Sequence, residues 1–92
     1  MEKLKAYREE IDAIDAQLIQ LFEARMDVVL QVAKYKKENH IEVLHQGREQ
    51  EVLERAQQQL QNKTYAPALT AFLQSTMDIS KDLQRTLIDN EN

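Results

Sequence analysis

The chain contains no cysteine and no tryptophan, and it has one glycine and one proline in 92 residues. Without cysteine there can be no disulfide and no thiolate nucleophile, and this absence agrees with a reducing compartment. The scarcity of Gly and Pro leaves long stretches of good helix formers, chiefly Glu, Gln, Lys, Leu and Ala. The composition therefore predicts one all-α domain that covers residues 1–92.

Segments typical of other protein classes are also missing. No apolar run approaches the roughly 20 residues that a membrane-spanning helix needs. The N-terminus lacks the basic and then apolar pattern of a signal peptide. The formal net charge of −4 and the few, scattered aromatic residues argue against nucleic acid as a partner. We therefore expect a cytoplasmic protein that binds neither a membrane nor nucleic acid.

The first forty residues organise the chain, because their apolar residues repeat at the seven-residue spacing of a helix that packs on other helices. Since no Gly or Pro interrupts them, one helix is predicted from Glu2 to Glu38 or Asn39. Such a helix would be about 55 Å long, whereas a compact domain of this size is about 30 Å across. We expect a second copy to cover the protruding apolar seam in an obligate two-fold homodimer. The two rows of this seam are Leu4, Ile11, Leu18 and Val32, and Tyr7, Ile14, Leu21 and Val28.

Two shorter helices are predicted in the rest of the chain. Residues 40–47 have no helical period and contain the single Gly, which indicates a loop with a short extended piece at residues 41–44. A second helix is expected to start near Arg48 and to fray at residues 61–63. A third should begin at Pro67, whose missing N–H costs nothing in a first helical turn, and fray at residues 89–92. The predicted fold is all-α, with one long N-terminal helix and two shorter ones.

Several polar residues are costly for a bundle with only a structural role: one lies in the apolar seam itself, and the others lie near it, at a helix start or on a face that apolar residues continue. Each alone has a plain structural explanation, such as fixing helix register, pairing with a carboxylate or facing solvent. Together they suit a small molecule that carries carboxylates, a hydroxyl and a weakly basic oxygen. The residues for hydrolytic or redox chemistry are missing, and His40 and His45 lack partners for a metal site, so the site would act by positioning and charge stabilisation. The set is Arg8, Arg25 and Lys36 in the first helix, Arg48 and Glu49 at the start of the second, and Ser80 and Gln84 in the third.

The order and spacing of these residues resemble a known family. Residues 8–18 (REEIDAIDAQL) resemble its opening pattern R-x-x-I-D-x-I-D-x-x-L, and the later members of the set follow in the family's order. The chain is thus similar, over nearly its whole length, to the all-helical (type II) chorismate mutases of the small, intertwined-dimer type. This resemblance implies the rearrangement of chorismate to prephenate, a step toward phenylalanine and tyrosine, with no cofactor.

The resemblance also implies a role for each residue, carried over by position. As the catalytic pair, Lys36 and Gln84 would flank the ether oxygen whose bond breaks, and Glu49 would accept the ring hydroxyl. The carboxylates of the substrate would be bound by Arg25, Arg48 and Ser80, together with Arg8 of the partner chain. The apolar walls of the pocket would be Val32, Val52 and Met77.

Two positions differ from the family pattern. His45, which we count among the substrate-binding residues, stands where Asp is frequent beside the substrate hydroxyl, and we expect the change to be tolerated because a backbone group could do the same task. Lys81 stands where an apolar wall residue is common. An additional cation there should either alter substrate preference or point to solvent.

Geometry independently favours a role for Arg8 in the partner's site. Arg8 and Arg25 lie about 25 Å apart along one helix, too far to share a small ligand. If two copies of this helix run antiparallel across a two-fold axis near its middle, each Arg8 comes near the Arg25 region of the other chain. Two equivalent sites would follow.

Two other hypotheses remain open at this point. One is an isochorismate-pyruvate lyase of the same fold, because a pair that hydrogen-bonds an ether oxygen serves either substrate. The other is a non-catalytic helical module whose seam only dimerises. Loss of chorismate absorbance on adding the protein separates an enzyme from a module, and salicylate fluorescence from isochorismate separates a lyase from a mutase.

Overall fold

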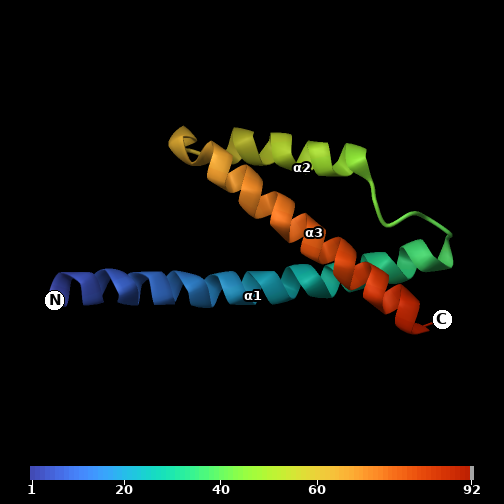
Figure 1. Ribbon diagram of the computed structural model, residues 1–92, viewed down its shortest axis with the longest axis horizontal. Coiled ribbons are helices and arrows are strands. Elements are labelled where there is room, and N and C mark those ends of the chain that lie inside the picture. Colours follow the sequence, from blue (N-terminus) through green and yellow to red (C-terminus); the bar gives the residue numbers. More distant parts are fainter. Residues whose placement is uncertain (92) are drawn as a thin grey trace.

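The computed structural model describes residues 1–91 and contains three α-helices, as predicted. They are α1 (Glu2–Glu38), α2 (Gln46–Gln59) and α3 (Ala66–Glu91), and a 3₁₀ turn, η1 (Lys63–Tyr65), connects α2 to α3. Residues 1–91 contain no strand, so the fold is all-α. In Figure 1, α1 spans the length of the molecule, α3 crosses over its C-terminal half, and α2 packs back along α3. None of the described helices is both long and apolar enough to cross a membrane.

The long first helix sets the shape of the molecule. It continues for 37 residues without interruption, and the molecule measures 54 × 27 × 14 Å. Glu2 in its first turn and Lys36 and Lys37 in its last turn complement the helix dipole. The predicted extent of this helix is confirmed.

The chain buries few side chains by itself. Within the described residues, the buried apolar side chains are Met26, Ala33 and Met77, and the buried polar ones are Ser80 and Gln84. All five belong to α1 or α3, so this small core lies where α3 crosses α1.

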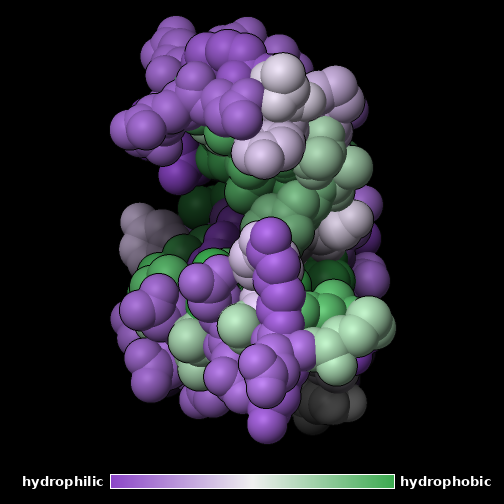
Figure 2. All heavy atoms as spheres, turned by 90° about the vertical axis from the view of Figure 1, so that its left-hand side faces the viewer, coloured by the Kyte–Doolittle hydropathy of each residue, from purple (hydrophilic) through white to green (hydrophobic). Residues whose placement is uncertain are grey.

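The first part of α1 is left largely uncovered by its own chain. Residues 1–24 are all exposed, including seam residues such as Ile11 and Leu21, which are 54% and 67% exposed. Figure 2 shows the molecule from the left-hand side of Figure 1, where the N-terminus lies. Hydrophobic residues (green) are visible there between hydrophilic residues (purple) at the top and bottom of the view. The seam that the heptad pattern predicted therefore remains largely uncovered in a single chain.

Some predicted boundaries were wrong. The second helix begins at Gln46, two residues before the predicted start, and residues 41–44 form no strand. The third helix begins at Ala66, which places Pro67 in its first turn as predicted. It continues through Glu91 instead of fraying from Asp89, because Leu87 and Ile88 are still half-buried; Asn92 lies outside the described residues.

The end of α1 is closed by a Schellman motif. The N–H of His40 donates to the carbonyl of Lys37, and the N–H of Ile41 donates to that of Lys36 at 2.8 Å. The motif requires a left-handed residue after the helix, and here it is His40, with φ of 55°. This reversal of the chain starts the loop that leads to α2.

Replacing His40 by Gly should stabilise the fold, because glycine adopts positive φ without the steric cost that an L side chain carries there. We expect the free energy of unfolding to rise by roughly 0.5–1 kcal/mol. Urea denaturation followed by circular dichroism would measure it. His40→Ala keeps a side chain at the same φ and is the matched control. An equal gain in both variants would assign the change to loss of the imidazole and not to the backbone.

Candidate active site

A cavity of about 170 Å³ lies between the three helices and the loop that precedes α2. Ten of the eleven site residues predicted from the sequence line it, although they come from distant parts of the chain. They are Arg25, Val32 and Lys36 from α1, His45, Arg48, Glu49 and Val52 from the start of α2, and Met77, Ser80 and Gln84 from α3. Arg8 is the exception.

The cavity is strongly cationic in a chain that is acidic as a whole. It is lined by the cationic side chains Arg25, Lys36, Arg48 and Lys81 and by one carboxylate, Glu49. The lining thus carries a formal excess of three positive charges, whereas the net charge of the chain is −4. Such a local excess attracts a small anion whatever the average charge of the surface.

The guanidinium of Arg25 is held in the seam by α3. Its Nη1 donates to Ser80 Oγ, and the Ser80 hydroxyl donates in turn to the carbonyl of Thr76 at 2.8 Å. Because the hydroxyl proton is engaged with a carbonyl and not with a base, Ser80 is not arranged as a nucleophile. It positions the arginine.

Lys36 connects α1 to the loop that joins α1 and α2. Its ammonium donates to the carbonyl of Val43 at 2.9 Å. An ammonium group has three N–H donors, so two remain for a ligand in the cavity.

His45 is the N-cap of α2. Its Nδ1 accepts a hydrogen bond from the N–H of Arg48 at 2.8 Å, and its carbonyl accepts one from the N–H of Glu49 at 3.1 Å. A Cβ at Gly47 would lie 3.4 Å from His45 Cε1, in ordinary van der Waals contact with the ring. Sequence reasoning missed this cap, since His is not among the residues favoured at that position, and it therefore placed the start of the helix too late.

Lys81 does not point to solvent. Its ammonium pairs with Glu49 Oε2 at 3.0 Å and with Asp78 Oδ1 at 3.3 Å. The bond to Glu49 is the main cause that raises the pKa of Lys81. Hydrogen bonds from Gln74 and Lys81 lower the pKa of Asp78. The ammonium of Lys81 is thus paired with Glu49, the carboxylate that lines the cavity.

Arg48 and Gln84 differ in their hydrogen-bond partners: the Arg48 side chain has one at the surface, whereas the oxygen of the Gln84 amide has none among the described residues. The guanidinium of Arg48 pairs with Glu51 at 2.8 Å, and its side chain is 56% exposed, so its charged end is bonded at the surface. Gln84 is buried, and its Oε1 has no hydrogen-bond partner within residues 1–91. An unpaired buried amide costs about 1–3 kcal/mol, and such groups in native proteins call for a functional explanation.

Arg8 is not brought to the cavity within one chain. It lies in the exposed first part of α1, beside Leu4, Lys5 and Asp12. Two lining residues, Val29 and Val43, were not predicted. Val29 lies one turn from both Arg25 and Val32, and this spacing could have indicated it.

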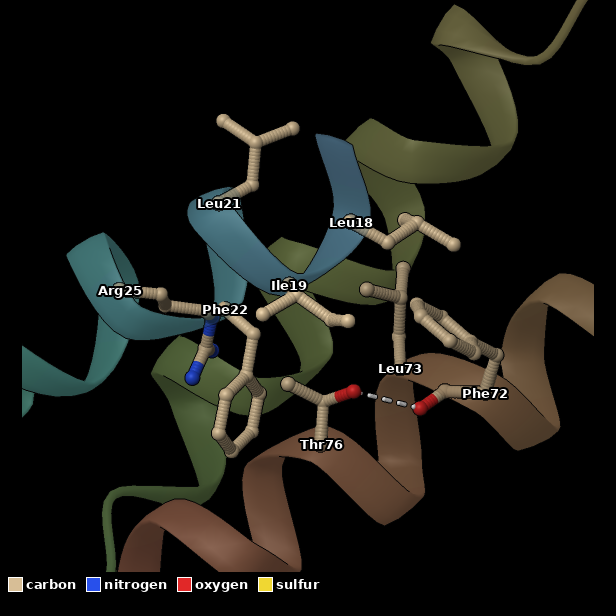
Figure 3. A pocket seen from close by; sticks show the side chains of 8 residues that line it. All are labelled: Leu18, Ile19, Leu21, Phe22, Arg25, Phe72, Leu73 and Thr76. Atoms are coloured by element: carbon tan, nitrogen blue, oxygen red, sulfur yellow. Dashed lines mark hydrogen bonds between the residues drawn. The ribbon is translucent and has the colours of Figure 1, made fainter. Parts of the chain in front are cut away.

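A larger cavity, of about 330 Å³, lies between the middle of α1 and the first half of α3. In Figure 3, Ile19 and Phe22 face Leu73 and Thr76 across it, whereas Leu21 extends away from α3. Arg25 is its one charged lining residue. The Thr76 hydroxyl is already bonded to the carbonyl of Phe72 at 2.8 Å (Figure 3). This cavity is apolar and lacks the groups that a polar substrate needs.

The helical fold and the cationic cavity together define a protein suited to bind a small polyanion. Residues 7–85 match the family described as chorismate mutase type II, and the chain belongs to this family. The chain is also similar to the T-protein of Haemophilus influenzae, with 45% identity over 49 residues, which are 53% of this chain and 13% of the T-protein. The match thus spans about an eighth of that relative's length. No solved structure matches the chain significantly.

Replacing His45 by Ala should destabilise the protein, because the N–H of Arg48 loses its acceptor. The expected loss is about 1 kcal/mol in the free energy of unfolding. His45→Asp supplies a carboxylate oxygen in the same place and should keep or exceed the wild-type stability. Urea midpoints of the three proteins, at one protein concentration and near neutral pH, measure this. Equal midpoints for the Ala variant and the wild type would show that the cap contributes nothing.

Proposed function

We propose that this chain is a chorismate mutase, a single domain over residues 1–92 that converts chorismate to prephenate on the route to phenylalanine and tyrosine. The observation that carries the proposal is the convergence of Lys36 and Gln84 with three further cations and one carboxylate in a single cavity. Family membership supports the assignment. No cofactor is needed.

The reaction is a pericyclic shift, so it needs neither a nucleophile nor an obligatory proton transfer. As its C–O bond stretches, the ether oxygen of chorismate gains negative charge. The ammonium of Lys36 and the amide N–H₂ of Gln84 would donate hydrogen bonds to this oxygen, and these bonds strengthen toward the transition state. The buried amide of Gln84 is consistent with this role, because no contact within residues 1–91 holds its Oε1 and so fixes the direction in which its N–H₂ points.

The arginines would hold the flexible substrate in its compact, reactive conformer. Arg25, which is already fixed by Ser80, would bind one carboxylate. Ser80 would bind the same carboxylate by turning its hydroxyl proton away from the carbonyl of Thr76. Arg48 would leave Glu51 to bind the substrate. This exchange costs little, since exposed ion pairs contribute only about 0–1 kcal/mol. Restricting the substrate in this way offsets the entropy lost at the barrier.

The ring hydroxyl would be bound by Glu49. The carboxylate lies at the start of α2, and the cap at His45 orients the first turn that carries it. With Nδ1 used for the cap, only Nε2 of His45 would be left to contact the substrate. The apolar walls, Val32, Val52 and Met77, would exclude water from the reacting bond.

The active form would be an intertwined homodimer in which Arg8 acts in the partner's site. Three observations support this assembly: residues 1–24 are exposed, the apolar seam runs through them, and Arg8 lies on the same uncovered segment. Covering the seam with a second, antiparallel α1 would bury it and bring Arg8 toward the cavity of the other chain.

Incubating the protein with chorismate tests the function directly. Loss of chorismate absorbance, with prephenate as product, is the expected result. Salicylate and pyruvate from isochorismate would identify a lyase of the same fold instead. No turnover of either compound by a folded protein would favour a helical module that only dimerises.

Replacing Gln84 by Glu should make the activity dependent on pH. The wild-type amide donates at any pH, whereas the carboxyl donates only when protonated, and a Glu normally titrates near pH 4.3. Neighbouring cations favour its charged form, so the variant should lose about 10²–10³-fold in kcat/KM at neutral pH and recover as the pH falls. The measurement is kcat/KM for both proteins from about pH 4 to about pH 8, which spans the titration of a normal Glu. Circular dichroism checks that both proteins stay folded. A flat, unchanged profile in the variant would leave Gln84 a packing residue.

Mixing an Arg8→Ala protein with an Arg25→Ala protein should restore activity that each lacks alone. If Arg8 acts across the dimer, one site of the mixed dimer carries both changes and the other carries neither. Sedimentation should first establish a species of twice the chain mass, and exchange of chains can be followed with one tagged variant. Mixed dimers that remain inactive would place Arg8 outside the partner's site.

A further inference from the structure

The cavity contains a cation for which the proposed reaction has no use. Lys81 lies one residue after Ser80 on α3, and its ammonium is bonded to the one carboxylate of the cavity, Glu49 of α2. The side chains of Lys81 and Glu49 are only 18% and 19% exposed. This ion pair joins α3 to α2 across the edge of the site.

A second side chain of α3 holds the other oxygen of the same carboxylate. Gln74 Nε2 lies 3.4 Å from Glu49 Oε1, while Lys81 Nζ lies 3.0 Å from Glu49 Oε2. Asp78, between them on α3, contacts both Gln74 and Lys81. Each oxygen of Glu49 is thus bonded from α3, which restricts the rotation of the carboxylate. A carboxylate has about four lone-pair sites, so about two remain for a ligand.

The nearby arginine does not perform this task. Arg48 is next to Glu49 in sequence, but its guanidinium is bonded to Glu51 on the surface side of α2. Among the described residues, Lys81 is therefore the cation that is paired with Glu49.

On the basis of the proposed function, we propose that Lys81 is a positioning residue: it orients Glu49 so that this carboxylate accepts a hydrogen bond from the ring hydroxyl of the substrate. Lys81 acts through Glu49 and does not touch the substrate. Discrimination in favour of a hydroxylated ring would then depend on a cation of α3 as well as on the carboxylate of α2.

The test compares kcat/KM for chorismate with that for an analogue in which hydrogen replaces the ring hydroxyl. Lys81→Met removes the charge and keeps most of the length of the side chain. For this variant we expect a loss of about 10- to 100-fold with chorismate. The loss with the analogue should be less than about threefold, because no hydroxyl has to be recognised. Lys81→Arg keeps a cation and should restore most of the preference for chorismate.

The same substitution in a Glu49→Gln background separates positioning from direct binding. If Lys81 acts through Glu49, Lys81→Met should have little further effect there. A loss that persists in this background, or equal losses for both substrates, would overturn the proposal. Arg85→Met is the matched control, because it removes an exposed cation one turn further along α3; it should leave the preference unchanged. Inactivity of the wild type toward chorismate would refute the proposed function itself, and with it this role.

Discussion

The structure depends on one helix that is longer than its own chain can cover. α1 carries an apolar seam along its length, but α3 crosses over its C-terminal half, and residues 1–24 are all exposed (Figure 1). The core of a single chain is accordingly small and sits at the crossing of α1 and α3. That crossing is also where Arg25 meets Ser80. Three of the five buried residues, Met77, Ser80 and Gln84, also line the cavity, so the core and the site share residues.

The cavity concentrates polar groups that a helical bundle would be more stable without. An arginine occupies a seam position, a buried glutamine has an unpaired oxygen within the described chain, and four cations line one small space. Each of these features carries a cost in desolvation or repulsion. The structure limits the cost through specific bonds: Ser80 accepts from Arg25, and Lys81 pairs with Glu49. What remains unpaired is then available to a ligand.

Helices were predictable from the sequence because their signals are local. The seven-residue spacing and the absence of Gly and Pro determined the extent of α1 almost to the residue. For the cavity, the order of the motifs predicted which residues line it but not how they are arranged. That arrangement depends on helix packing, which brings together residues that lie far apart in the chain. The sequence could not predict how side chains pair. The cap at His45, the surface bond of Arg48 and the ion pair of Lys81 depend on rotamers and on neighbours from other elements.

In the proposed dimer, assembly and completion of the site would be the same event. The segment that leaves apolar surface exposed also carries Arg8, so the contact that buries the seam would also deliver the last cation. An unassembled chain would then lack both a sufficient core and a complete set of substrate contacts. Selection for stability and selection for activity would then act on the same surface of α1. A change that weakened the dimer would also weaken the site, so the charged cavity would be maintained together with the fold. Since dimer formation follows mass action, dilution would remove stability and activity together.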